Sequence, residues 1–315
     1  MIPKGWDIQP LANLAEVRSG VAKGKSGLKD PITIPYLRVA NVQDGHVNLD
    51  EVKEIQIERD QLERYSLKAG DVLMNEGGDF DKLGRGDVWL GQIDPCAHQN
   101  HVFAVRPDQE KLDSFYLAAL AASHYGKTYF LRNAKRSTNL ASINSTQIKN
   151  FPALVPPLPE QKKIAQILST WDKAITTTEQ LLANSQQQKK TLMQQLLTSK
   201  KRLLDDNGVR FSGEWKHGFL SDIAKIAKGK ALSSKNLTEG NYPVIAGGKT
   251  SPYSHGEFTH ENIITVSASG AYAGYVAYHS HKIWASDCSV VAAKKNSSTL
   301  FIYQLFTHLQ NKIYS

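Results

Sequence analysis

The sequence predicts an α+β protein in which two repeated mixed α/β domains, the second of them truncated, are separated by a long coiled-coil helix. Three observations predict it: one stretch occurs twice, prolines crowd the segment just before residue 160, and neither proline nor glycine interrupts residues 160–204. The boundaries that follow are 1–155 for the first domain, 156–206 for a proline-bounded segment with the long central spacer helix, and 207–315 for the partial second domain.

The composition fits two ordinary domains and a connector. Of the 315 residues, 41% are hydrophobic and 22% are charged, close to the averages of globular proteins. No apolar run approaches the roughly 20 residues that cross a bilayer, and the start of the sequence lacks the apolar stretch of a signal peptide, so we expect a cytoplasmic protein without membrane contact. Cys96 and Cys288 lie far apart, which favours a reducing compartment and provides no disulfide framework.

The first domain shares its opening with the second. Residues 6–22 align without a gap with residues 215–231, at an offset of 215 − 6 = 209, and Trp, Leu, Ala, Gly and Ala recur in place. Short β-branched and aromatic runs between glycines predict β-hairpins in both copies, and the Leu and Ala density of residues 115–125 predicts a helix. Two looser matches continue the repeat, 35–37 with 243–245 and 71–74 with 262–265.

The connector begins with prolines, which cannot lie inside a helix because proline removes a backbone donor and clashes with the preceding turn. Apolar side chains then recur at helical spacing over residues 160–204, which predicts a helix of about 45 residues, or roughly 67 Å. A heptad register fits it, with a seam that is apolar at its ends and polar in the middle, and turn formers at 205–208 should end it. The residues expected to pair along this rod are Leu168, Trp171, Ile175, Leu182, Leu192, Leu196 and Leu203.

Three short motifs suggest catalysis or metal binding, and each is incomplete. Residues 20–26 end like a phosphate-binding P-loop but have three residues between the glycines instead of four, and at 248–250 Pro243 takes the place of the first glycine. Residues 96–101 offer soft metal ligands without a second ligand pair. Neither a carboxylate cluster for metal-assisted cleavage nor the motifs of an adenine methyltransferase occur. We therefore expect no catalytic site, no cofactor and no metal.

The basic residues indicate a different role. Lysine and arginine outnumber aspartate and glutamate by 38 to 30, which favours a polyanionic partner but is also compatible with a merely soluble basic protein. Beside glycine-bearing loops, such side chains can follow a phosphate backbone or read base edges, whereas the alternative for any one of them is a solvated surface. The candidates for DNA binding are Lys82, Arg85, Arg132, Lys135, Arg136 and Asn139.

Four segments resemble, in order and spacing, the exit of a target-recognition domain into the central helix of type I restriction-modification specificity subunits: 143–144, 151–152, 155–165 and 172–175. The resemblance implies two target-recognition domains, each contacting one half of a bipartite site in double-stranded DNA. Helices between them would act as a ruler and dock the methyltransferase (modification) subunits. Methyl transfer and ATP-driven cleavage would belong to those subunits and to the restriction/translocase subunits that join through the complex.

The second copy departs from that pattern. Adding either repeat offset to Ile143 puts its second exit at 143 + 187 = 330 or 143 + 209 = 352, beyond residue 315, so we expect an incomplete second domain. One alternative is a truncated stand-alone DNA-binding or regulatory protein that competes with an intact specificity subunit. Another is an NTP-using enzyme built on a glycine-lysine loop. The apolar seam needs a partner, which predicts a homodimer through antiparallel rods when the chain is alone.

Overall fold

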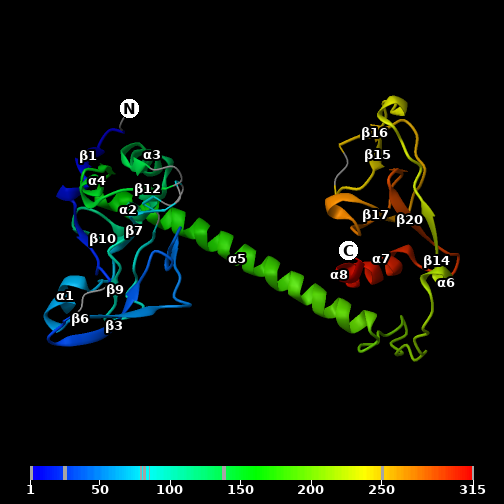
Figure 1. Cartoon of the computed structure of the whole chain (residues 1–315), viewed down its shortest axis with the longest axis horizontal. Coiled ribbons are helices and arrows are strands. Elements are labelled where there is room, and N and C mark those ends of the chain that lie inside the picture. The colour runs from blue at the N-terminus through cyan, green and yellow to red at the C-terminus, as the bar shows by residue number, and fades with distance from the viewer. Residues whose placement is uncertain are drawn as a thin grey trace. The chain divides into compact units, whose positions relative to one another are not determined.

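The computed structural model describes residues 3–23, 27–78, 80, 83–84, 86–136, 140–249 and 252–313. It divides into two compact units, Met1–Thr177 and Thr178–Ser315. The division falls within a long helix, α5 (Leu158–Leu197), and each unit combines strands with short helices (Figure 1). The predicted fold class is therefore confirmed.

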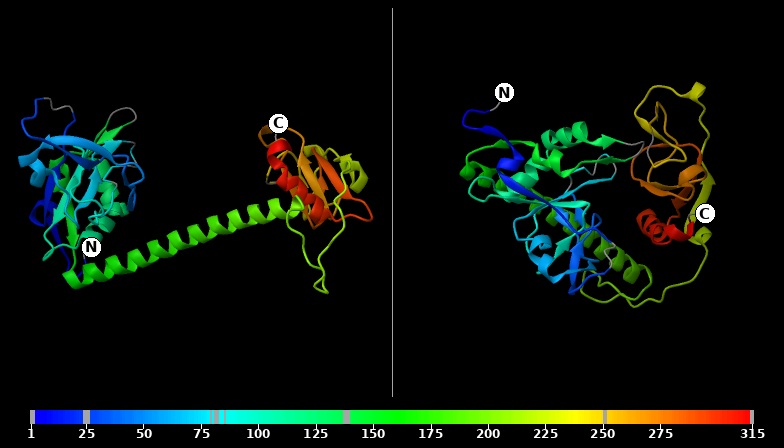
Figure 2. Two further views of the ribbon diagram at one scale, coloured as in Figure 1. Left: turned by 90° about the horizontal axis from the view of Figure 1, so that it is seen from below. Right: turned by 60° about the vertical axis from the view of Figure 1, so that its left-hand side comes forward.

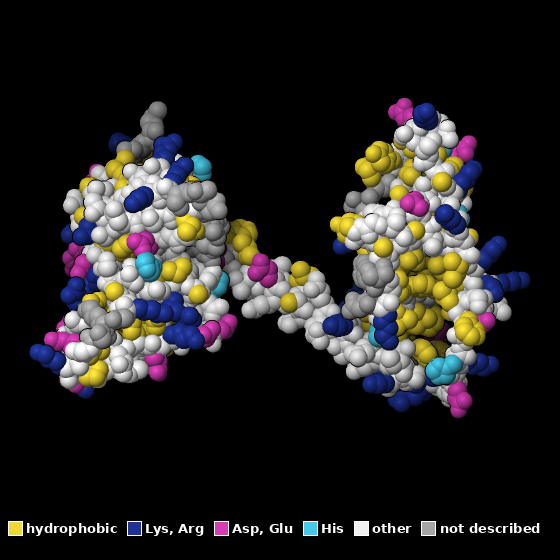
Figure 3. Space-filling model, in the orientation of Figure 1, with side chains coloured by type: hydrophobic (Ala, Val, Ile, Leu, Met, Phe, Trp, Pro, Cys, Tyr) yellow, Lys and Arg dark blue, Asp and Glu magenta, His cyan; other side chains and the backbone are white. Residues whose placement is uncertain are grey.

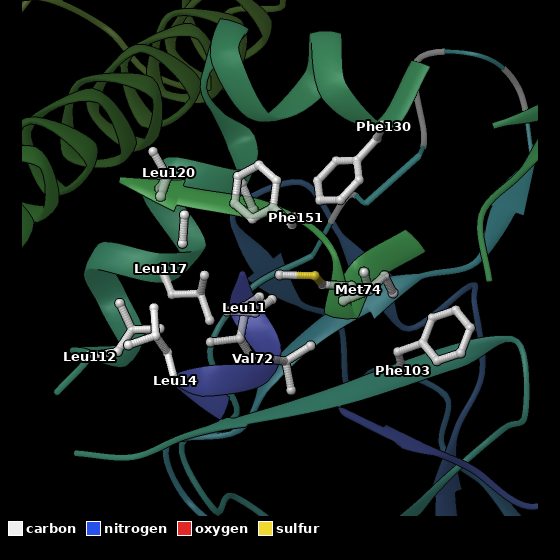
Figure 4. Close-up of a cluster of buried hydrophobic side chains, with 14 of the residues drawn as sticks. Leu11, Leu14, Val72, Met74, Phe103, Leu112, Leu117, Leu120, Phe130 and Phe151 are labelled. Carbon is white, nitrogen blue, oxygen red and sulfur yellow. The ribbon is translucent and has the colours of Figure 1, made fainter. Parts of the chain in front are cut away.

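The first unit is built around an antiparallel sheet with strand order β2-β10-β7. Aromatic and aliphatic side chains from this sheet and its helices form the largest buried cluster of the described residues. Phe130 and Phe151 stack in it with ring centroids 5.3 Å apart, and Figure 4 shows Met74 and Leu117 directed into the same interior. The elements are β2 (Ala15–Ser19), β10 (Val102–Pro107), β7 (Val72–Asn75), α2 (Ser114–Ala122) and α3 (His124–Asn133).

A second sheet of this unit has strand order β6-β3-β9, in which β9 runs parallel to β3. Val21 follows β2 and donates its N–H to the carbonyl of His98 at 2.7 Å, which joins the first sheet to β9. The preceding Gly20 is required here, because a Cβ atom would overlap the same carbonyl oxygen. The bounds are β3 (Pro31–Leu37), β6 (Lys53–Glu58), β9 (Ala97–His98), the hairpin β4 (Val42–Gln43) and β5 (His46–Val47), and α1 (Leu62–Tyr65).

Two small sheets complete the first unit. One has strand order β11-β12-β8, and the other pairs β1 with β13 antiparallel. Between β12 and β13, Asn144 and Gln147 form a reciprocal capping box that starts α4, because each side chain accepts the backbone N–H of the other residue. The bounds are β8 (Gly77–Gly78), β11 (Lys135–Arg136), β12 (Ala141–Ser142), α4 (Ser145–Lys149), β1 (Asp7–Pro10) and β13 (Pro152–Val155).

Helix α5 packs Ala165 into the core of the first unit, and a buried amide in its first turn hydrogen-bonds to that unit. The side chain of Gln161 accepts the N–H of Asp113 at 2.9 Å and donates to the carbonyls of Lys111 at 3.0 Å and Pro156 at 2.8 Å. All these groups would otherwise be unsatisfied polar atoms in or near the core. The left view of Figure 2 shows the helix as one uninterrupted element.

The helix ends earlier than the sequence pattern predicts, at Leu197 rather than Leu204, a difference of 204 − 197 = 7 residues. Ser199 takes a left-handed φ of 56°, and the N–H of Lys201 turns back to the carbonyl of Gln195 at 3.1 Å, which stops the helical ladder. The expected rod position Leu203 therefore lies outside the helix. It accepts the N–H of Phe211 through its carbonyl instead.

The second unit contains a four-stranded antiparallel sheet with order β14-β20-β17-β18 and a three-stranded sheet with order β16-β15-β19. The last pair of the smaller sheet, β15 and β19, is parallel. The bounds are β14 (Ala224–Lys228), β20 (Cys288–Ala293), β17 (Ile263–Ser267), β18 (Val276–His279), β16 (Ser254–His255), β15 (Tyr242–Ile245), β19 (Trp284–Ala285), α6 (Leu220–Ile223), α7 (Thr299–His308) and α8 (Gln310–Ile313).

The predicted repeat is confirmed by the backbone contacts of the two units. Strand β14 pairs with β20 and β20 with β17, as β2 pairs with β10 and β10 with β7, and each unit has one parallel pair beside this sheet. Gly229, at 20 + 209, meets the carbonyl of Ser286 as Gly20 meets that of His98. The shared glycine therefore marks the same close backbone approach in both copies.

None of the helices in the described part of the chain combines the length and the apolar character that a bilayer crossing requires.

Candidate nucleic-acid interface

A groove of about 520 Å³ lies against the β11-β12-β8 sheet of the first unit. Its lining includes both residues of β8, both residues of β12 and four charged or ionisable side chains, namely Glu76, His101, Lys135 and Arg136. Two of the six predicted DNA-binding residues are thus brought together at one hollow.

Glycines shape the floor of this groove. Gly77 pairs with Ser142 and Gly78 with Ala141 across β8 and β12. A Cβ atom on Gly77 would overlap the carbonyl oxygen of Ala141 and lie only 3.0 Å from the Cα of Ser142. Any other residue would push the strands apart, so the glycine-bearing segment after β7 serves close strand packing.

The two cations of the groove differ in how they are held. Both Lys135 and Arg136 are exposed on β11. The Arg136 guanidinium donates to the carbonyl of Leu131 at 2.7 Å and lies 5.9 Å from the centre of the Phe80 ring, so its position is restrained. Among the described residues, no carboxylate pairs with Lys135. Its side chain is exposed, so its ammonium group meets solvent at the groove.

Arg132 does not join this pair. It lies in the last turn of α3, where a cation complements the partial negative charge of the helix end, and it lines a separate hollow of about 490 Å³. Tyr125 and Tyr129 line the same hollow and donate their hydroxyls to the carbonyls of Pro152 at 2.7 Å and Gln147 at 2.9 Å. The remaining candidates Lys82, Arg85 and Asn139 lie outside the described residues.

The sequence pattern does not single out Glu76, and it includes His101 only in the 96–101 cluster. The structure brings them together although 25 positions separate them, with His101 Nδ1 against Glu76 Oε2. The backbone of Glu76 is held on both sides, because its N–H donates to the carbonyl of His101 at 2.9 Å and its carbonyl accepts the N–H of Ile143 at 2.8 Å. The only sequence signal for this position is the acidic residue directly before the Gly77-Gly78 pair.

Cys96 and His98 of the 96–101 cluster are buried in the first unit. Burial raises the pKa of the Cys96 thiol to about 12, which disfavours the thiolate that binds metals. His98 is buried, donates from Nδ1 to the carbonyl of Val102 at 2.6 Å, and has its pKa lowered by burial to about 4. In the part of the chain that the structure describes, no three His, Cys, Asp or Glu side chains are placed to hold a metal ion.

The glycine-lysine loop of the second unit makes its contacts with side chains of that same unit. Ser267 donates its hydroxyl to the carbonyl of Gly247 at 2.9 Å, and Lys249 Nζ lies 5.1 Å and 5.7 Å from the ring centres of Tyr272 and Tyr275. The hollow beside this loop measures about 20 Å³, which is room for about one water molecule. This geometry does not suit the phosphates of a nucleotide.

Comparison with known proteins identifies the same domain type in both units. A family model described as the type I restriction modification DNA specificity domain matches residues 3–185 and 212–315. A proposed specificity subunit of type I restriction enzyme MjaX from Methanocaldococcus jannaschii is 31% identical over 178 residues, 56% of this chain and 41% of that protein. The type I restriction enzyme StySPI specificity subunit of Salmonella potsdam is 29% identical over 164 residues, 51% of this chain and 35% of that protein.

The chain thus spans about two fifths of the length of these curated relatives. A crystal structure of the type I restriction-modification S subunit from M. genitalium shares the fold, with a TM-score of 0.60 and 15% identity, over 99% of this chain and 78% of that chain. The two matched segments cover most of the sequence. The repeated sheet order and the long helix agree with this match. The chain belongs to the family of type I restriction modification DNA specificity domains.

Proposed function

We propose that the chain recognises double-stranded DNA through the groove on the β11-β12-β8 sheet, as the non-catalytic specificity component of a type I restriction-modification complex. The observation that carries the proposal is the exposed pair Lys135 and Arg136 at a hollow lined by β8 and β12. Family membership supports the same function.

The chemistry of the groove suits a nucleic acid. The exposed ammonium group of Lys135 can neutralise a phosphate and release its counterions. A guanidinium that is restrained by a carbonyl and an aromatic ring presents its remaining donors in a fixed direction, as reading of guanine requires. The net charge of +8 adds a general attraction for the duplex.

The partners follow from the proposed role. Target-recognition domains at 1–155 and 207–315 would each meet one half of a bipartite site, with the segment 156–206 setting their spacing. The methyltransferase subunits would dock on α5, and the restriction/translocase subunits would join through the complex. We place this assembly in the cytoplasm, where it has access to DNA. Docking on α5 is supported by its exposed seam, in which Leu168, Trp171 and Ile175 are 43%, 67% and 55% exposed.

The test is selection from a random duplex library by the purified chain, with and without the methyltransferase subunits of its system. The proposal expects enrichment of a defined sequence and, with the subunits, methylation of adenines within it. A double variant Lys135→Ala/Arg136→Ala should lose the enrichment while its circular dichroism spectrum is unchanged. A parent chain that enriches no sequence would contradict the proposal.

The same exposed seam supports a homodimer through antiparallel rods when no other subunit is present. Leu182 is 58% exposed and Leu192 45%, whereas Leu196 is half-buried. We expect the parent to sediment as a dimer at micromolar concentration and Leu182→Lys to sediment as a monomer, because a charge in the seam is costly to bury. Gln187→Lys adds the same charge outside the seam and should leave the dimer intact. A monomeric parent would rule out this pairing.

A further inference from the structure

Glu76 is the one carboxylate among the described lining residues of the groove, which Lys135 and Arg136 line as well. We propose that Glu76 is a specificity-determining residue that accepts a hydrogen bond from the exocyclic amino group of a cytosine in the major groove. The inference rests on the proposed function and adds to it a base and a position of the site.

The position of Glu76 is rigid. Glu76 lies between β7 and β8. Its N–H donates to the carbonyl of His101 at 2.9 Å, and its carbonyl accepts the N–H of Ile143 at 2.8 Å. Its side chain is 30% exposed, so part of the carboxylate reaches solvent in the groove. A base-reading group needs such a fixed backbone, because a hydrogen bond discriminates between bases only if the donor and acceptor are already placed.

Electrostatics restricts what this carboxylate can contact on DNA. A carboxylate repels phosphate oxygens, so on a DNA-facing surface it is compatible with base edges and not with the backbone. It has acceptors and no donors. In the major groove only the amino groups of cytosine and adenine donate, whereas guanine and thymine present acceptor oxygens there. The adenine amino group lies beside the acceptor N7, which a carboxylate cannot satisfy, so the geometry favours cytosine.

His101 is a positioning residue for this contact. Its Nδ1 donates to Oε2 of Glu76, and the histidine side chain is 54% exposed at the same groove. Within the described part of the chain, Oε1 of Glu76 accepts no hydrogen bond. One carboxylate oxygen is therefore oriented by the protein, and the other is left for the base.

The experiment compares Glu76→Gln with the parent chain on the duplex sequences that the parent selects. At one position of the site, the parent should bind on the order of tenfold less well when C·G is replaced by T·A or when the cytosine is replaced by 2-pyrimidinone, which lacks the amino group. Glu76→Gln should lose this preference and accept thymine, because its amide can donate to O4. At all other positions of the site, the base preferences of Glu76→Gln should equal those of the parent.

Two further variants separate base reading from simple loss of charge. Glu63→Gln removes a carboxylate that is 89% exposed on α1, outside the groove, and should keep every base preference of the parent. His101→Gln should weaken the preference at the Glu76 position alone, while circular dichroism and the remaining positions are unchanged. If His101→Gln keeps the full preference, the positioning role is wrong.

Other outcomes overturn the proposal directly. Glu76→Gln with the parent's preferences at every position would show that the carboxylate reads no base. Tighter binding to all sequences with unchanged preferences would reduce its role to repulsion of phosphate. A preference that shifts at an adenine would overturn the assignment to cytosine. A parent that selects no sequence at all would contradict the proposed function itself, which is a separate result.

Discussion

The two units share one strand arrangement but differ in how much of their apolar surface they bury. Among the described residues, the largest buried cluster of the first unit has twenty members, whereas the two clusters of the second have five each. In the first unit, Ile148, Phe151 and Ala153 from the segment after β12 complete the cluster. In the second, Leu300 and Phe301 on α7 are 53% and 42% exposed, and Figure 3 shows hydrophobic side chains gathered around this helix.

A buried charge also distinguishes the units. Asp71 and Arg106 form a bidentate ion pair in the first unit, with both N–O distances 2.7 Å, between the start of β7 and β10. The strand pairings place Ile263 and Ala292 at the corresponding positions of the second unit, at 71 + 192 and 106 + 186, because Val72 lies opposite Val105 as Ile264 lies opposite Val291. The same strand arrangement thus carries an ion pair in the first unit and two apolar side chains in the second.

The largest expected effect is on the core of the first unit. Phe151→Ala should lower its free energy of unfolding by about 4 kcal/mol, because a fully buried ring is replaced by a cavity. Hydrogen exchange followed by mass spectrometry would localise the loss to peptides of residues 1–177. The control Phe301→Ala removes a ring that is 42% exposed and should cost far less. Equal losses in both variants would contradict the difference in burial between the units.

The ion pair gives the next largest effect. Arg106→Ala should destabilise the first unit by about 3 kcal/mol, because it leaves the carboxylate of Asp71 buried without its partner. The double variant Asp71→Ile/Arg106→Ala, which introduces the residues of the second unit, should recover part of the loss in denaturant unfolding, because no buried charge is left unpaired. Lys111→Ala breaks an exposed ion pair with Asp108 and should not change stability measurably. If the double variant recovers no stability, the residues of the second unit cannot replace the ion pair in the first.

Both units should lose stability in mild acid. Burial lowers the pKa of His98 in the first unit and of His279 in the second to about 4, from the ordinary value of 6.5. Unfolding then takes up a proton below pH 6.5, so the stabilisation present above that pH is lost as the pH falls toward 4, by about 2–3 kcal/mol per histidine. Denaturant unfolding at pH 7 and pH 4.5 measures this. His98→Gln should remove the loss in the first unit only, and an unchanged pH profile there would disprove the assignment.

The smallest expected effect concerns DNA. The described residues of the second unit form no counterpart of the β11-β12-β8 sheet, so the groove distinguishes the first unit. Lys135→Ala should weaken binding evenly over all sequences and lower the slope of log affinity against log salt by about one. Lys68→Ala, whose ammonium is 3.9 Å from Glu63 outside the groove, is the matched control. Equal salt slopes for parent and Lys135→Ala would remove Lys135 from the interface.

Local sequence features determined the class, the repeat and the helix. Proline, glycine and hydrophobic spacing act within a few residues, which is why the repeated opening, the proline-bounded start of α5 and the strands at 71–74 and 262–265 could be predicted. The end of α5 could not, because a single left-handed residue, Ser199, ends it inside a run that is otherwise favourable for a helix.

Only the tertiary structure decided which side chains share a site. Arg132 and Lys135 are three positions apart and line different hollows, because α3 ends and β11 begins between them. Glu76 and His101 are 25 positions apart and touch, because β7 and β10 pair in the antiparallel sheet and bring the residues beside their ends together. Strand pairing joins residues that are distant in sequence, and no local pattern records which partner a strand will choose.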